Sequence, residues 1–82
     1  MSNPKEKKMK TLNEGDTLYE SKYDALTKLY EGQVAVAKAE LYVYFSTSVG
    51  VAEHPELITS MDSLMDKLTA AEEKLKSLQN NF

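Results

Sequence analysis

The chain has no cysteine, no tryptophan and no arginine, and only one histidine, two prolines and three glycines in 82 residues. Without cysteine there are no disulfides and no thiolate metal ligands, which are two common ways of stabilising a small domain. A chain of this length is one domain at most and buries only about 60% of the surface that its unfolded form exposes. Association with another chain is the remaining source of stability.

Long apolar runs are absent as well. No stretch approaches the roughly 18 residues that a membrane-spanning helix needs. The N-terminus has no charged region followed by an apolar one, so we expect no signal peptide. The absence of cysteine fits a reducing compartment. These features together predict a soluble, cytoplasmic protein.

Residue patterns typical of metal sites, nucleophilic catalysis and phosphate binding are missing too. His54 is the only histidine, and with Glu53 and Glu56 it does not reach the number and spacing of donors of a metal site. The same residues are better explained as the start of a helix. The hydroxyl residues at 46–48 have no partner arranged for nucleophilic catalysis, and three scattered glycines form no phosphate-binding loop. We therefore expect no enzymatic activity, no cofactor and no metal.

Charge is unevenly distributed along the chain. Four lysines against one glutamate give residues 1–10 a charge of +3, so the remainder must carry −6 to reach the net charge of −3. This stretch contains Pro4 and no apolar period, which predicts a flexible lysine-rich arm over residues 1–12. All ten cations are lysines. The chain therefore lacks the guanidinium forks that favour reading of base edges, and sequence-specific nucleic-acid binding is not expected.

Residues 16–47 have the pattern of one long helix, with Asp16 expected to cap its N-terminus. At about 100° per residue this helix has two apolar seams, roughly 140° apart. The aromatic seam repeats every eleven residues and contains Tyr19, Tyr23, Leu26, Tyr30, Val34, Ala37, Leu41 and Tyr44 or Phe45. The small-residue seam steps by four and three and contains Ala25, Leu29, Gly32, Val36, Ala39 and Val43.

Two positions in this helix allow alternatives. Gly32 costs about 1 kcal/mol relative to alanine in a helix interior, so it marks either a kink or close packing. Close packing is favoured, because Ala25 and Ala39 share its face. Residues 42–45 have the β-branched and aromatic composition of a strand. A helix is favoured there, because the helical period continues and no second strand exists to pair with it.

A second helix is predicted over residues 55–79. Gly50 suits the left-handed residue that follows a helix, residues 48–54 form the connector, and Pro55 suits the first helical position, with Glu56 favourable beside it. An unbroken heptad pattern follows. This heptad seam contains Leu57, Met61, Leu64, Leu68, Ala71, Leu75, Leu78 and Phe82.

Two helices joined by a short connector predict an all-α fold, an antiparallel two-helix hairpin over residues 13–82. The heptad seam can cover only one seam of the first helix, and the aromatic side chains have most to lose in water. The predicted intrachain core is therefore Tyr19, Tyr23, Leu26, Tyr30, Val34, Leu41, Phe45, Leu57, Met61, Leu64, Leu68, Leu75 and Leu78. The predicted oligomer interface is Ala25, Leu29, Gly32, Val36, Ala39 and Val43. We expect a four-helix bundle or coiled-coil oligomer, with a dimer favoured.

The junction from Val49 to Leu57, which contains Val-Gly-x-x-Glu-His-Pro, and the heptads after it resemble small uncharacterised helical-hairpin proteins of tailed bacteriophages. The resemblance covers about residues 40–80. It implies a phage-encoded accessory protein or host-directed binder, located in the host cytoplasm. It carries over no functional residue.

The function expected from these features is that of a non-enzymatic structural or protein-interaction module. It would self-associate through the first helix and bind a protein partner that the sequence does not identify. The alternative is an accessory protein that binds nucleic acid electrostatically through the lysine-rich arm of residues 1–12.

If the arm binds nucleic acid, the affinity for duplex DNA should fall steeply with salt, because counterion release drives such binding. Deletion of residues 1–10 should abolish it. Fluorescence anisotropy at several salt concentrations measures both effects. Binding that does not depend on salt contradicts the hypothesis.

Overall fold

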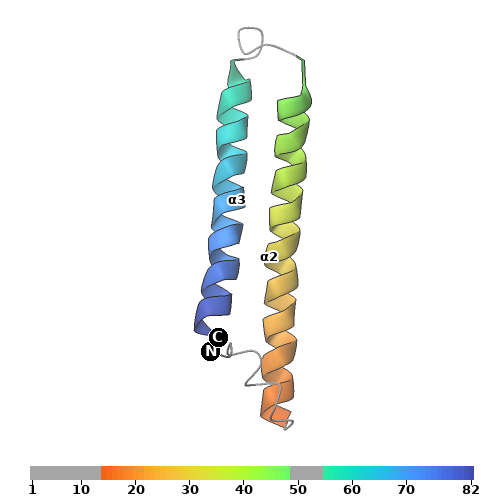
Figure 1. Ribbon diagram of the computed structural model, residues 1–82, viewed down its shortest axis with the longest axis vertical. Helices are drawn as coiled ribbons and strands as arrows, with labels where there is room; N and C mark the ends of the chain where they lie inside the picture. The colour runs from red at the N-terminus through yellow and green to blue at the C-terminus, as the bar shows by residue number, and fades with distance from the viewer. Residues whose placement is uncertain (1–13, 49–54) are drawn as a thin grey trace.

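A computed structural model describes residues 14–48 and 55–82 of the chain. These residues form two helices, α2 (Glu14–Ser46) and α3 (Glu56–Asn81), and no strand. The helices run antiparallel and side by side (Figure 1). The predicted all-α hairpin is confirmed, and residues 42–45 continue α2 as a helix. The lysine-rich arm, Gly50 and His54 lie outside the described residues.

α2 begins at Glu14, two residues before the predicted start. Asp16, which was expected to cap the helix, lies inside the first turn, and its side chain lies outside what the structure describes. Acidic residues are favourable there, near the positive end of the helix dipole. At the other end, the Thr47 main-chain N–H donates to the Tyr44 carbonyl (3.3 Å) and the Thr47 hydroxyl donates to the Val43 carbonyl (2.8 Å). These bonds satisfy two of the carbonyls that a helix end leaves without partners.

α3 begins at Glu56, directly after Pro55, whose φ of −62° and ψ of −25° are already helical. The fixed φ of proline thus aligns the chain for the first turn, and Glu56 supplies the favourable acidic charge in that turn. The helix continues to Asn81, two residues past the predicted end. The Phe82 N–H donates to the Leu78 carbonyl (3.0 Å), which extends the helical hydrogen bonding to the last residue.

The core is one line of contact between the two helices. Half-buried side chains of the aromatic seam and the heptad seam lie along this line, so the aromatic seam faces α3. Among the described residues no large side chain is completely buried. The residues that are buried are Tyr23, Ala37 and Leu41 on α2 and Leu64, Ala71 and Leu78 on α3.

Phe45 was predicted in this core, and that prediction is wrong because its side chain is 74% exposed. Eleven residues turn a helix by about 20° more than three full turns. Along the repeat, Tyr23 is therefore buried, Val34 half-buried and Phe45 exposed. Tyr44 takes the place of Phe45 and is half-buried. Leu26, also assigned to the core, lies at its edge and is 39% exposed.

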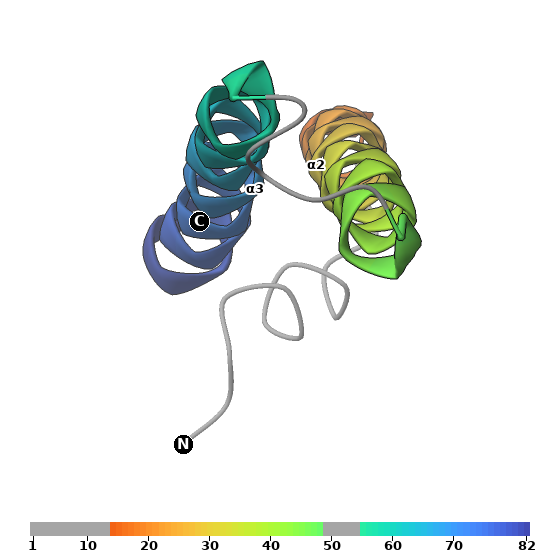
Figure 2. The same cartoon turned by 90° about the horizontal axis from the view of Figure 1, so that it is seen from above.

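The hairpin is long and thin, with extents of 59 × 20 × 15 Å. Its radius of gyration is 18.1 Å, against about 12 Å for a compact domain of this length. Among residues 14–48 and 55–82, no third helix covers either face of α2 and α3 (Figure 2). Many large apolar side chains consequently stay exposed: Leu18, Leu26, Leu29, Val36, Tyr42, Val43, Phe45, Ile58, Met65 and Phe82.

Truncation of Leu64 to alanine should reduce the free energy of unfolding by about 2 kcal/mol, because it removes a buried side chain and leaves a cavity. The matched control is Met65→Ala on the adjacent position, which is 43% exposed and should cost much less. Urea denaturation followed by circular dichroism, at one fixed protein concentration, measures both. Equal losses would mean that α3 presents a different face to α2.

Candidate functional site

The small-residue seam of α2 is exposed along its whole length. Its large members Leu29, Val36 and Val43 are 52%, 58% and 64% exposed, and Ala25, Gly32 and Ala39 are exposed as well. From the first to the last of these residues the seam is about 27 Å long at 1.5 Å per residue. A continuous apolar strip of this size is typical of surfaces that bind a partner.

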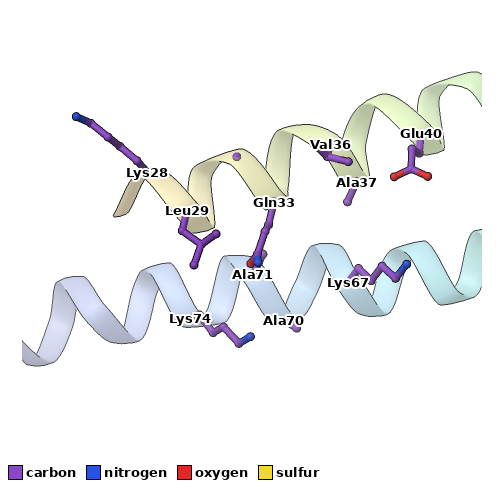
Figure 3. A pocket seen from close by; sticks show the side chains of 11 residues that line it. Lys28, Leu29, Gln33, Val36, Ala37, Glu40, Lys67, Ala70, Ala71 and Lys74 are labelled. Atoms are coloured by element: carbon purple, nitrogen blue, oxygen red, sulfur yellow. The ribbon is translucent and has the colours of Figure 1, made fainter. Parts of the chain in front are cut away.

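A groove of about 620 Å³ lies beside this seam, between α2 and α3 (Figure 3). The α3 residues Ala70 and Ala71 have small side chains, so they leave space between the two helices. Gln33 extends from α2 toward Ala71, whereas Lys28 points away from α3. The apolar part of the lining consists of Leu29, Gly32, Val36, Ala37, Ala70 and Ala71.

A second hollow of about 530 Å³ continues this surface toward the connector end of the helices. Glu40 lines both hollows, and Val43 brings the small-residue seam into the second one. The remaining lining residues are Tyr44, Thr47, Glu56, Leu57 and Ser60. We call the surface formed by the two hollows the groove face.

The larger hollow of the groove face is weakly positive on a chain that is negative overall. Three lysines against Glu40 give the lining a charge of +2, while the whole chain carries −3. The amine of Lys74 lies 5.9 Å from the centroid of the Tyr30 ring, a cation–π geometry that ties this lysine to its own hairpin. The lining of the larger hollow thus combines apolar side chains with three lysines.

The space over Gly32 is open among the residues that the structure describes. α2 continues through this residue without interruption, and a Cβ added there would meet no atom within 4 Å. The close packing expected at Gly32 is therefore not made by α3. The approximately 1 kcal/mol that glycine costs in a helix interior is not offset by any contact inside the hairpin.

Sequence reasoning missed three α3 residues that line the larger hollow of the groove face, namely Lys67, Ala70 and Lys74. These residues flank the heptad seam, and their spacing of three and four places them on one side of it. That spacing is visible in the sequence. Which flank of a seam borders an open groove depends on how the two helices face each other, which the sequence pattern leaves undetermined.

Other kinds of site receive no support from the residues that the structure describes. Among residues 14–48 and 55–82, no three histidine, cysteine or acidic side chains gather to hold a metal ion. Neither described helix is long and apolar enough to cross a membrane. No family model, curated protein or solved structure matches the chain. The functional argument therefore depends on the exposed seam and the groove face.

Replacement of Gly32 by alanine should raise the free energy of unfolding of the single hairpin by about 1 kcal/mol, because the helix gains propensity and the new methyl group meets no atom. Thermal denaturation at the lowest usable protein concentration measures this change. The control is Ala35→Gly on the same helix, also exposed, which should lose a similar amount. A destabilised Gly32→Ala hairpin would show that the space over Gly32 is filled within one chain.

Proposed function

We propose that this protein is a non-enzymatic interaction module that self-associates through the small-residue seam of α2. The exposure of the whole seam along an uninterrupted helix is the observation that supports this most directly. Covering Leu29, Val36 and Val43 would stabilise the assembly by roughly 1 kcal/mol for each side chain, since each is about half exposed. A two-fold dimer buries each residue twice, once on each chain.

Self-association would also add buried apolar surface to a hairpin that buries little by itself. Two helices with one line of contact bury little apolar surface, and the chain has no cysteine to stabilise them in another way. A dimer of hairpins brings four helices together, which is the number found in the simplest helical bundles. We infer that α2, with neighbours on two sides, is the central helix of the assembly.

Exposed apolar side chains outside the small-residue seam support the binding of a separate protein partner. Phe45, Ile58 and Met65 are 74%, 52% and 43% exposed, and none belongs to the small-residue seam. Phe45 lies near the end of α2 and Ile58 near the start of α3, so both are at the connector end of the hairpin. Aromatic residues and methionine are common at the centres of protein interfaces. The resemblance to phage-encoded hairpin proteins favours a host protein as this partner.

Substitution of Val36 by glutamate should convert the assembly to single hairpins, because it places a charge in the centre of an apolar interface. Helicity should remain largely intact, since the side chain is 58% exposed in the single hairpin. Sedimentation equilibrium at tens of micromolar protein gives the mass, and far-ultraviolet circular dichroism gives the helicity.

The control for this experiment is Lys38→Glu, an exposed position of α2 outside the seam. It changes the net charge more than Val36→Glu does, yet it should leave the mass unchanged. A wild-type chain that is monomeric at this concentration would refute self-association. An unchanged mass of the Val36→Glu variant would show that the interface lies elsewhere.

A further inference from the structure

Large and small residues alternate along the exposed seam. Every seventh residue from position 25 is small, and every seventh residue from position 29 is large and about half exposed or more. The small members are Ala25, Gly32 and Ala39, and the large members are Leu29, Val36 and Val43. Such a surface is complementary to a copy of itself only when the two copies are placed in the correct direction.

We propose that two copies of the chain pack along this seam with their α2 helices antiparallel, so that Gly32 of one copy lies opposite Val36 of the other. This inference rests on the proposed self-association and specifies its geometry. The steps of the seam, 4-3-4-3-4, read the same in both directions. If one of the two helices is reversed, its seam therefore matches the seam of the other. Each layer, meaning a pair of residues at the same height on the two helices, then contains one large and one small residue. The pairs are Ala25 with Val43, Leu29 with Ala39, and Gly32 with Val36.

A parallel pair in register would place each residue opposite its own copy. Layers with two leucines or two valines would then alternate with layers with two glycines or two alanines. The thick layers would hold the helices apart and leave voids at the thin ones, and both voids and overpacking are destabilising. The antiparallel pair has layers of even thickness, and a two-fold axis relates its two copies.

The space over Gly32 supplies a separate argument for this register. A Cβ at Gly32 would meet nothing within 4 Å inside the hairpin, so the hairpin itself does not need glycine there. Val36 is one of the large seam residues that remain exposed, at 58%. In the antiparallel pair the valine of each copy occupies the space over the glycine of the other. A side chain larger than hydrogen at position 32 would compete for that space.

The flank of the seam that points away from α3 carries a cation and an aromatic ring. Lys28 precedes Leu29 and Tyr42 precedes Val43, so both lie on this flank. Lys28 points away from α3 in Figure 3, and Tyr42 is 74% exposed. The antiparallel register brings Lys28 of one copy within two residues, or about 3 Å along the helix, of the level of Tyr42 of the other, where an amine over an aromatic ring is favourable. It also keeps the two copies of Lys28 apart.

The direction of packing can be measured by disulfide trapping, because the natural chain has no cysteine. Ala25→Cys and Val43→Cys are made as separate single-cysteine variants, both at exposed positions outside the intrachain core. The two variants are mixed, unfolded and refolded together, and oxidised in a glutathione buffer. We expect the disulfide between Cys at 25 and Cys at 43 to exceed either homodisulfide several-fold. Light scattering of each variant before oxidation establishes its mass.

A second measurement tests the register through Gly32. Gly32→Ala should weaken self-association by about tenfold, through overpacking against Val36 of the other copy, although it stabilises the single hairpin. Ala35→Gly should not weaken self-association by crowding, since it adds no atoms. Sedimentation equilibrium over a range of concentrations gives the dissociation constants.

The outcomes separate this geometry from self-association itself. Dimers in which the cysteine at position 25 pairs mainly with its own copy would overturn the antiparallel arrangement and leave the proposed self-association standing. Dimers of the Gly32→Ala variant that are as tight as the wild type would overturn the register. Absence of any dimer, in the wild type and in the variants, would overturn both proposals.

Discussion

The constraint on which this structure depends is that one helix can cover only one face of another. α2 has two apolar seams, and α3 has the single heptad seam that can pack on one of them. α3 lies against the aromatic seam, where Tyr23 and Leu41 are buried. The large rings remove most apolar area from water. The small-residue seam is left exposed for that reason, and the proposed function follows from what would cover it.

The same constraint explains why the interior of the hairpin is so thin. A two-helix contact surrounds no side chain on all sides, so even its most buried residues lie at the edge of solvent. Two contacts between the helices add to it: the Tyr19 hydroxyl donates to the main-chain oxygen of Phe82 (2.5 Å), and the Lys74 amine lies over the ring of Tyr30, near the middle of α2. Such contacts are worth about 1 kcal/mol or less when they are exposed. A third or fourth helix would add far more by burying the open faces.

Gly32 connects stability with association in the proposed assembly. Within one chain it is a weak point of α2, because glycine loses more backbone entropy than alanine and makes no compensating contact. Between two chains it would become the place where the helices come closest. An assembly of this kind sacrifices some stability of the separate hairpin for a tighter fit between copies.

Local periodicity was sufficient to predict much of this molecule. The helical character of residues 42–45, the start of α3 directly after Pro55 and the antiparallel hairpin all follow from patterns within one or two turns of helix, because apolar spacing and proline geometry act locally. The helix ends were displaced by two residues at Glu14 and Asn81, since several neighbouring residues can serve as a terminus at similar free energy.

The tertiary structure decided what depends on the relative rotation of the two helices. It exposed Phe45, because a drift of about 20° in each eleven-residue repeat accumulates along α2. It placed Lys67 and Lys74 beside the groove and left the space over Gly32 open among the described residues. The sequence by itself determined that α2 has two apolar seams, because side-chain spacing is a property of the helix. Only the packing of α3 decided which of them is covered, because contact between helices depends on both surfaces at once.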